Sequence, residues 1–201
     1  MATENLRSPA CWLPLTYAVA MSANLGQTEF AVLRQTIATR GTARMVLVPV
    51  TMVGWAALCG AILLFADVPV AALVPLVVLV AGFEAIHALH VGVERVGRYL
   101  QVYYETTPDG PLWESSVTSV GPALPGGGID PLFTVVFIGA TFINMIPVLL
   151  PSPTRLELGV LGVLHVIFVG RVVRARGAAA RQRAVELESF KAVRARQLGQ
   201  A

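Results

Sequence analysis

Long apolar stretches separated by short polar segments make up most of this chain. Four such stretches stand out, namely residues 45–66, 68–83, 131–150 and 156–170. None shows the alternation of period two that a strand requires, and backbone groups in lipid must be bonded within their own segment, so each is predicted to be a helix. With its flanking residues, each supplies about the 20 residues that cross a hydrocarbon core of about 30 Å. The pattern predicts an all-α integral membrane protein with a four-transmembrane-helix bundle.

The second apolar stretch continues without a helix-breaking residue into a charged segment that ends before Pro108. Its polar side chains include Glu84, His87, His90, Glu94, Arg95 and Arg98. At 100° per residue, His87, Glu94 and Arg98 share one face, and aliphatic side chains occupy the opposite one. A helix that leaves the apolar region with two distinct faces is expected to pack against another helix.

The connections between the apolar stretches differ in length. Residues 67–69 and 151–153 are short turns that contain proline, so they are predicted to join antiparallel neighbours. Residues 106–130 form a connection that is long for packed helices, which is typical of a functional or mobile loop. We interpret the glycine run at residues 126–128 as a hinge, because it lacks the Gly-Lys-Ser/Thr signature of a phosphate-binding loop.

The segment before the first span also carries a helical pattern. Phe30, Leu33 and Ile37 recur at helical spacing over residues 27–44, and Gly41 is a plausible helix end. This helix is predicted to lie on the inner membrane face or to dock on the rest of the bundle. Residues 1–26 are interpreted as an interfacial or bundle-covering segment rather than a signal peptide.

Composition and charge exclude an ordinary soluble protein and orient the chain. Hydrophobic residues make up 55% and charged residues 13%, whereas soluble domains carry about 25% charged residues. Mean hydropathy is +0.69. If both termini lie in the cytoplasm, all of the 15 Lys and Arg residues except Arg155 lie inside. The positive-inside rule therefore predicts an inner (plasma) membrane protein whose N- and C-termini are cytoplasmic.

These expectations give the chain a predicted organisation in three parts. Residues 1–44 form a cytoplasmic N-terminal segment with an interfacial amphipathic helix, residues 45–175 a four-helix transmembrane domain, and residues 176–201 a basic cytoplasmic helical tail. The predicted spans are residues 45–66, 68–92, 131–150 and 156–175, with residues 106–130 as a cytoplasmic loop.

Few residues in the sequence suggest catalytic chemistry. Cys11 and Cys59 fall in different layers of the predicted topology, so both are expected to be free thiols. No Ser/His/Asp set, no cysteine with a base and no nucleotide-binding loop is recognisable, which favours a non-enzymatic protein and no catalytic residues. No cofactor is predicted either.

The histidines raise the question of a metal or a haem. Glu84 and His87 have the spacing of one half of a di-iron carboxylate site, but the second pair and the additional carboxylates are missing. His87 lies about 28 Å along the second span and His165 about 14 Å from the same membrane face, too different in depth to hold one haem iron. His165 instead matches Asn144 in depth, so an interhelical hydrogen bond between them is predicted, and no metal site.

The charged cluster of Glu84, His87, His90, Glu94, Arg95 and Arg98 allows three interpretations. The structural one is a salt-bridged seam between the second helix and either residues 27–44 or the tail. The second is an anion or lipid-headgroup site with Arg95 and Arg98 as phosphate partners. The third is a proton-responsive gate at His87.

Three functional hypotheses follow. The first is a non-enzymatic assembly or anchoring subunit that acts through its cytoplasmic helices, with a homo-oligomer or another membrane protein as partner. The second is an ion or proton pathway lined by Glu84, His87, Asn144 and His165, and the third is a membrane enzyme or binding site for lipid headgroups. The basic tail is expected to contact anionic headgroups rather than nucleic acid, because interleaved aromatic residues are missing apart from Phe190.

Overall fold

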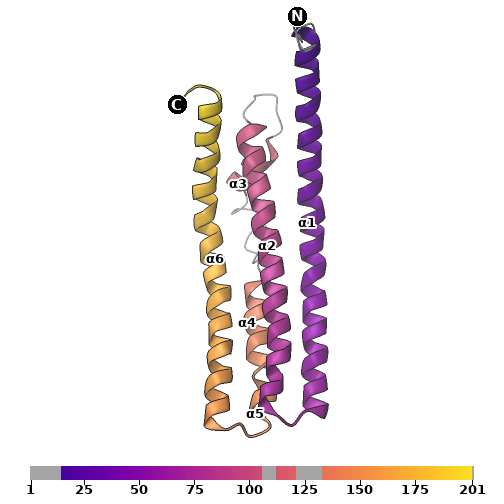
Figure 1. Cartoon of the computed structure of the whole chain (residues 1–201), viewed down its shortest axis with the longest axis vertical. Coiled ribbons are helices and arrows are strands. Elements are labelled where there is room, and N and C mark those ends of the chain that lie inside the picture. Colours follow the sequence, from indigo (N-terminus) through magenta and orange to yellow (C-terminus); the bar gives the residue numbers. More distant parts are fainter. Residues whose placement is uncertain (1–14, 106–111, 121–132, 201) are drawn as a thin grey trace, which may run out of the picture.

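The computed structural model describes residues 15–105, 112–120 and 133–200, which are helical apart from short connections (Figure 1). The elements are α1 (Leu15–Phe65), the 3-10 helix η2 (Pro69–Ala72), α2 (Leu73–Tyr103), α3 (Trp113–Val120), α4 (Thr134–Ile143), α5 (Ile146–Leu149) and α6 (Arg155–Gln197). No strand occurs in these ranges, so the predicted all-α class is confirmed. Residues 1–14, on which part of the N-terminal interpretation depends, lie outside the described residues.

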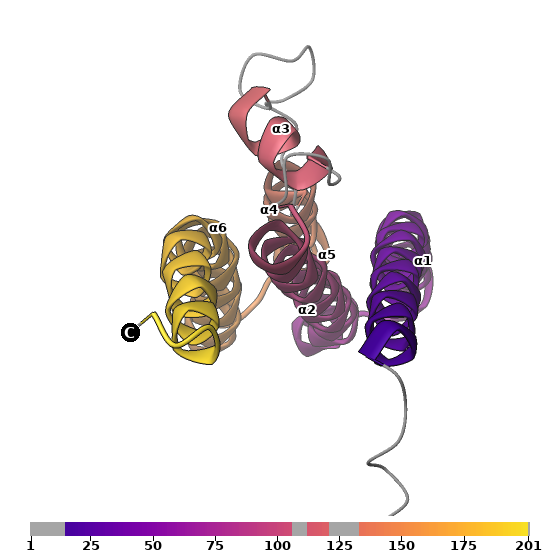
Figure 2. The ribbon, with the colours of Figure 1, turned by 90° about the horizontal axis from the view of Figure 1, so that it is seen from above.

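Three long helices stand side by side, with α2 in the middle. Viewed from above, α1 and α6 flank α2, while α4 and α5 lie behind it and α3 lies beyond α4 (Figure 2). Helix α2 contacts α1, α3, α4 and α6. The turn after α1 and the turn before α6 lie at one end, and the start of α1 and the end of α6 lie at the other (Figure 1). Helices α1 and α2 therefore form the antiparallel pair that the short turn predicts.

Helix α1 is continuous where the sequence suggested a break. The predicted helix end at Gly41 is wrong, because α1 runs as one helix of 51 residues from Leu15 to Phe65. A glycine inside a helix costs only about 1 kcal/mol relative to alanine, and the alanine and arginine residues around it are good helix formers. Residues 27–44 are therefore collinear with the first apolar stretch and pack beside α2, so the predicted separate interfacial helix is corrected to the docked alternative.

Three helices are long and apolar enough to cross a membrane. They are Gly26–Phe65, Pro69–Tyr103 and Arg155–Gln197. The remaining apolar segment, Thr134–Leu149, is shorter and is interrupted between α4 and α5. At 1.5 Å per residue it is about 24 Å long, less than a hydrocarbon core of about 30 Å. The described residues therefore fit a helical membrane protein with three long apolar helices, and the predicted number of four spans is not confirmed.

The interruption between α4 and α5 has a local cause. Pro147 lacks the backbone N–H that would bond to the carbonyl of Ile143, so the helical ladder cannot continue through this point. The chain instead turns at Asn144 and Met145 before α5 begins. This break brings the Asn144 side chain into the middle of the bundle, where it is fully buried.

The bundle has two halves of different character. The apolar half contains η2, α4, α5, α1 from Met45, α2 as far as Phe83 and α6 as far as Gly170. Its interior is a cluster of apolar side chains that includes Leu79, Phe83, Phe137 and Phe168. Its outer surface also carries large apolar side chains, as a lipid-facing surface does and a water-facing one rarely does. The remaining parts of α1, α2 and α6, together with α3, form the polar half.

The long connection after α2 contains a helix that the sequence did not predict. Helix α3 is held to the end of α2 by Glu105, whose carboxylate accepts hydrogen bonds from the backbone N–H groups of Glu114 and Ser115. The first N–H groups of a helix have no partner within it, so this carboxylate caps α3. Arg34 of α1 adds an ion pair to Glu114 at 3.0 Å. The glycine run at residues 126–128, interpreted as a hinge, lies outside the described residues.

Candidate functional site

The apolar half contains one buried polar cluster, centred on Asn144. The Asn144 side-chain oxygen accepts hydrogen bonds from Trp55 Nε1 at 3.1 Å and Cys59 Sγ at 3.3 Å. Its amide nitrogen lies 3.1 Å from the carbonyl oxygen of Ala72 and 3.0 Å from His165 Nε2. An amide side chain can make about four such bonds, so Asn144 is saturated. It joins α1, η2 and α6 at the break between α4 and α5.

His165 has no ring nitrogen left for a ligand. Its Nδ1 lies 2.7 Å from the carbonyl oxygen of Leu161, which can only accept, so we assign the ring proton to Nδ1. Nε2 then accepts the hydrogen bond from the Asn144 amide. The structure thus brings together the two residues that the sequence paired, with a neutral imidazole that is closed to a metal or a haem.

Apolar side chains separate this cluster from the charged residues farther along α2. Between Ala72 and Glu84, the buried side of α2 carries Leu76, Leu79 and Phe83. From Leu76 to Phe83 these positions extend about 10 Å along the helix axis. The Phe83 ring packs edge-on against two further buried rings, with centroids 5.3 Å from Phe137 and 6.0 Å from Phe168. These packed rings therefore lie between the Asn144 cluster and Glu84 along α2.

The polar half contains a second cluster, formed by ion pairs between α2 and α6. Glu186 of α6 pairs with Arg95 at 3.0 Å and with Arg98 at 2.9 Å. Glu94 pairs with Arg98 at 3.2 Å and with Arg183 at 3.0 Å. Arg98 lies at the centre and is only 7% exposed. We call these five residues the ion-pair seam.

The ion-pair seam leaves little capacity for an outside ligand. Glu186 also accepts a hydrogen bond from Gln182 at 2.6 Å, so both of its oxygens are occupied. Arg95 and Arg98 donate to carboxylates of the chain itself. A lipid phosphate at these arginines would have to displace a carboxylate. The geometry therefore favours the structural interpretation of these residues over the headgroup site.

Two other members of the predicted cluster have separate surroundings. Glu84 forms an ion pair of 2.8 Å with Arg171 of α6. The His87 ring stacks on Phe83, with centroids 6.1 Å apart. The six residues that the sequence grouped are thus divided among three places along α2, because a helix of this length spreads them over more than 20 Å.

The third place is the contact of His90 with α1. Arg44 Nη1 lies 2.9 Å from His90 Nδ1, and since a guanidinium only donates, this ring nitrogen accepts. One turn earlier on α1, Arg40 lies over Gly92, where an added Cβ would lie 2.6 Å from its guanidinium. Glycine at this position therefore lets the arginine approach the backbone of α2.

Sequence reasoning missed the partners on the other helices. These are Arg44, Trp55, Cys59, Arg171, Arg183 and Glu186. A weak signal was present in the tail, where Arg183 and Glu186 stand three residues apart and therefore on one helix face. Nothing in the sequence gives the register of α6 against α2, which decides the pairing.

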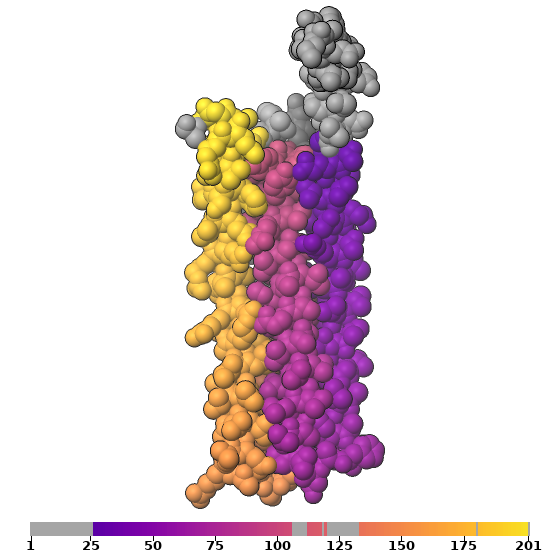
Figure 3. Space-filling view, in the orientation of Figure 1, coloured from indigo at the N-terminus to yellow at the C-terminus, as the bar shows by residue number. Residues whose placement is uncertain are grey.

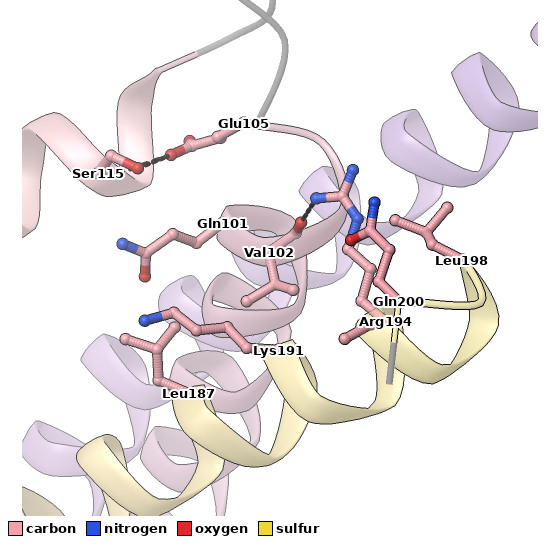
Figure 4. A pocket seen from close by; sticks show the side chains of 10 residues that line it. Gln101, Val102, Glu105, Ser115, Leu187, Lys191, Arg194, Leu198 and Gln200 are labelled. Atoms are coloured by element: carbon pink, nitrogen blue, oxygen red, sulfur yellow. Dashed lines mark hydrogen bonds between the residues drawn. The ribbon is translucent and has the colours of Figure 1, made fainter.

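A cavity of about 530 Å³ lies at the far end of the polar half, between α2, α3 and α6. Its walls include Gln101, Glu105, Lys191 and Arg194, which Figure 4 shows around the opening. The charged groups there are engaged: Arg194 donates to the carbonyl of Val102, Glu105 accepts from α3, and Lys191 pairs with Glu188 at 2.8 Å. The cavity therefore has mixed character and no dominant charge.

Among the described residues, no group of three or more His, Cys, Asp and Glu side chains could hold a metal ion. Glu84 and His87, the pair with di-iron spacing, gain no further carboxylate from a neighbouring helix there. No family model, curated protein or solved structure matches this chain. Its function has to be inferred from its own geometry.

Proposed function

We propose that the chain is a non-enzymatic, multi-pass inner-membrane protein that acts as an assembly or anchoring subunit through its cytoplasmic helices. The observation that carries this proposal is the one-sided packing of α1 and α6 in the polar half. Between Gly26 and Arg44 of α1, no side chain is fully buried, and the same holds for the described side chains from Arg176 to Gln200. Two long helices that contact the bundle on one side alone leave most of their surface to a partner.

The topology that we propose places the polar half in the cytoplasm. All of the basic residues in the described ranges except Arg155 belong to this half, as the positive-inside rule requires. In this topology α4 and α5 form the third of four spans, although short, and both termini lie in the cytoplasm. An even number of crossings is needed because the start of α1 and the end of α6 lie at the same end of the bundle (Figure 1).

The polar half has the dimensions of a stalk. It extends beyond the apolar half by about 40 Å along α6, from Arg171 to Gln197. The ion-pair seam fixes α6 against α2, and the carboxylate of Glu105 at the end of α2 holds α3. Anchoring in the bilayer alone does not require such an extension, whereas binding of a partner outside the membrane does.

Apolar side chains on the outer surface of the polar half indicate where a partner could bind. Val32 of α1, Val185 of α6 and Trp113 of α3 are all well exposed there. Exposed tryptophan is typical of the residues that contribute most to protein interfaces. The partner is another membrane protein or a second copy of this chain.

The two alternative functions have less support. A pathway through Glu84, His87, Asn144 and His165 would have to cross the packed rings around Phe83. A headgroup enzyme at Arg95 and Arg98 would need donors that are already bound to Glu186. No observation favours either of them over the assembly role.

The test is cross-linking in native membranes from a photoreactive amino acid placed at Val32, Trp113 or Val185. We expect an adduct of defined mass from at least one of these positions, identified by mass spectrometry as a second copy or as one membrane protein. The matched control is Leu64, which is equally exposed but lies in the apolar half and should give no protein adduct. The assembly role is excluded if all three positions give no adduct and the purified protein is a monomer in mild detergent.

A further inference from the structure

An apolar groove opens on the surface between α2 and α6 in the apolar half. Its volume is about 410 Å³. The floor is formed by the buried side chains of Leu76 and Phe168, and the rims include Val77 and Ile167, which are well exposed. In the proposed membrane topology, this groove faces the hydrocarbon tails of the bilayer.

One end of the groove is charged. Arg171 closes the groove toward the polar half, with its guanidinium 5.9 Å from the centroid of the Phe83 ring and 2.8 Å from Glu84. Arg174 follows one turn later on the same face of α6, three residues from Arg171 and seven from Ile167. It is exposed and has no ion-pair partner among the described residues. Two arginines against one glutamate leave this end with a net positive charge.

We infer that the groove binds one molecule of an anionic phospholipid, with an acyl chain between α2 and α6 and its phosphate at Arg171 and Arg174. The apolar floor and the basic end match the two parts of such a molecule. In the proposed topology, Arg171 lies at the cytoplasmic edge of the hydrocarbon, which is the depth of a headgroup phosphate in that leaflet. The inference rests on the membrane placement in the proposed function, and not on the assembly role.

The charge distribution of the groove favours a phospholipid over a helix. From Leu73 to Val80 the groove follows α2 for about 10 Å, and Arg171 is the charged residue among those that line it. The basic end also has no counterpart at the other end of the groove, as expected for a ligand with one charged and one apolar end.

The proposed site differs from the headgroup site that the sequence suggested at Arg95 and Arg98. Those side chains lie more than two turns farther into the polar half and are bound to Glu186. Arg174 is free of such a partner among the described residues, and Arg171 lies directly on the groove. The apolar groove, which periodicity alone does not indicate, is what distinguishes the two places.

The test uses the full chain, delipidated in detergent and titrated with phosphatidylglycerol or phosphatidylcholine, with bound lipid counted by native mass spectrometry. We expect one tightly held phosphatidylglycerol and weaker binding of phosphatidylcholine. Arg174→Gln should weaken phosphatidylglycerol binding about fivefold, the equivalent of about 1 kcal/mol for one headgroup contact. Ile167→Trp, which fills the groove from its exposed rim, should reduce binding at least as much.

The matched control is Arg181→Gln, which removes another exposed arginine of α6 that lies beyond the groove and does not line it. This variant should bind phosphatidylglycerol like the unchanged protein.

The inference is overturned if both lipids bind equally, or if the control loses as much affinity as Arg174→Gln. It is also overturned if Ile167→Trp changes the oligomeric state and leaves lipid binding intact, since a helix of a second copy would then occupy the groove. Competition by inorganic phosphate alone would show a site for a free anion and would likewise overturn it. Loss of the cross-links from Val32 or Val185 has no bearing on this result.

Discussion

Glu186 is the residue of α6 that links it to two arginines of α2. Its two carboxylate oxygens accept from Arg95, Arg98 and Gln182, and Arg98 is almost fully buried beneath it. Removal of one partner of a buried ion pair is costly because it leaves the other charge without compensation. The nearby pair of Glu188 and Lys191 has the same chemistry but lies in solvent.

We predict that Glu186→Gln lowers the free energy of unfolding by about 1 to 2 kcal/mol, because Arg98 then keeps Glu94 as its sole carboxylate partner. A fully buried pair would cost about 3 to 5 kcal/mol, but the Glu186 side chain is 15% exposed and is partly screened. The measurement is denaturant unfolding in mild detergent. Glu188→Gln is the control and should change stability by less than about 0.5 kcal/mol, since its side chain is 71% exposed. Equal effects of the two variants would show that the ion-pair seam does not stabilise the bundle.

At this scale, the sequence identified residues better than it identified partners. Asn144 and His165 could be paired because both are polar at the same depth of apolar helices, where an unpaired polar group is costly. Trp55 and Cys59 were not identified as partners of Asn144, since both are ordinary residues of an apolar span. Their roles depend on the rotation of α1 about its axis, which sequence periodicity does not define.

At the scale of the helices, the attachment of α3 is sensitive to pH through Glu114. Burial raises the pKa of the Glu114 carboxyl above its usual range, Arg34 opposes this shift, and the nearby Glu105 adds to it. A raised pKa in the docked state means that docking favours the protonated acid. Glu114 therefore stabilises the docked state of α3 fully when the pH is below the ordinary pKa of glutamate. This stabilisation is lost as the pH rises through the raised pKa.

We predict that the distance between α3 and α1 becomes more broadly distributed as the pH rises from about 4 to about 8, because ionised Glu114 is less favourable in its half-buried place. Spin labels at Ser119 and Gln35, both exposed, would report this distance by pulsed electron resonance. Glu114→Gln has no charge to gain and should give the same distribution at both values. If the broadening persisted in that variant, another group would be responsible.

The sequence predicted the long helices well and their boundaries poorly. The apolar stretches and their turns were sufficient to find α1, α2 and α6. The break at Gly41 was expected from a local propensity of about 1 kcal/mol, which packing against α2 outweighs. Helix α3 was missed because much of its stability comes from Glu105, a residue outside the helix, and from Arg34, which is distant in sequence.

At the scale of the whole molecule, the proposed orientation can be measured directly. We predict that a membrane-impermeant thiol reagent labels Arg155→Cys in intact cells, and labels Gln200→Cys only after the cells are permeabilised. The reason is that these positions lie at opposite ends of α6, one at the apolar turn and one at the end of the basic tail. Both variants are made in a chain that carries Cys11→Ser, and that chain without a further substitution is the control, since its remaining cysteine, Cys59, is buried. Labelling of Gln200→Cys in intact cells would invert the topology.

Helix α1 passes through both halves as one uninterrupted helix. It is one rod of about 76 Å, of which the first part lies beside the stalk and the last part belongs to the apolar half (Figure 3). A rod of this length that tilts by about 5° at its membrane end moves its other end sideways by about 7 Å. A small change in bilayer thickness that tilts α1 at its membrane end would therefore shift the position of any partner bound to the stalk by a similar distance.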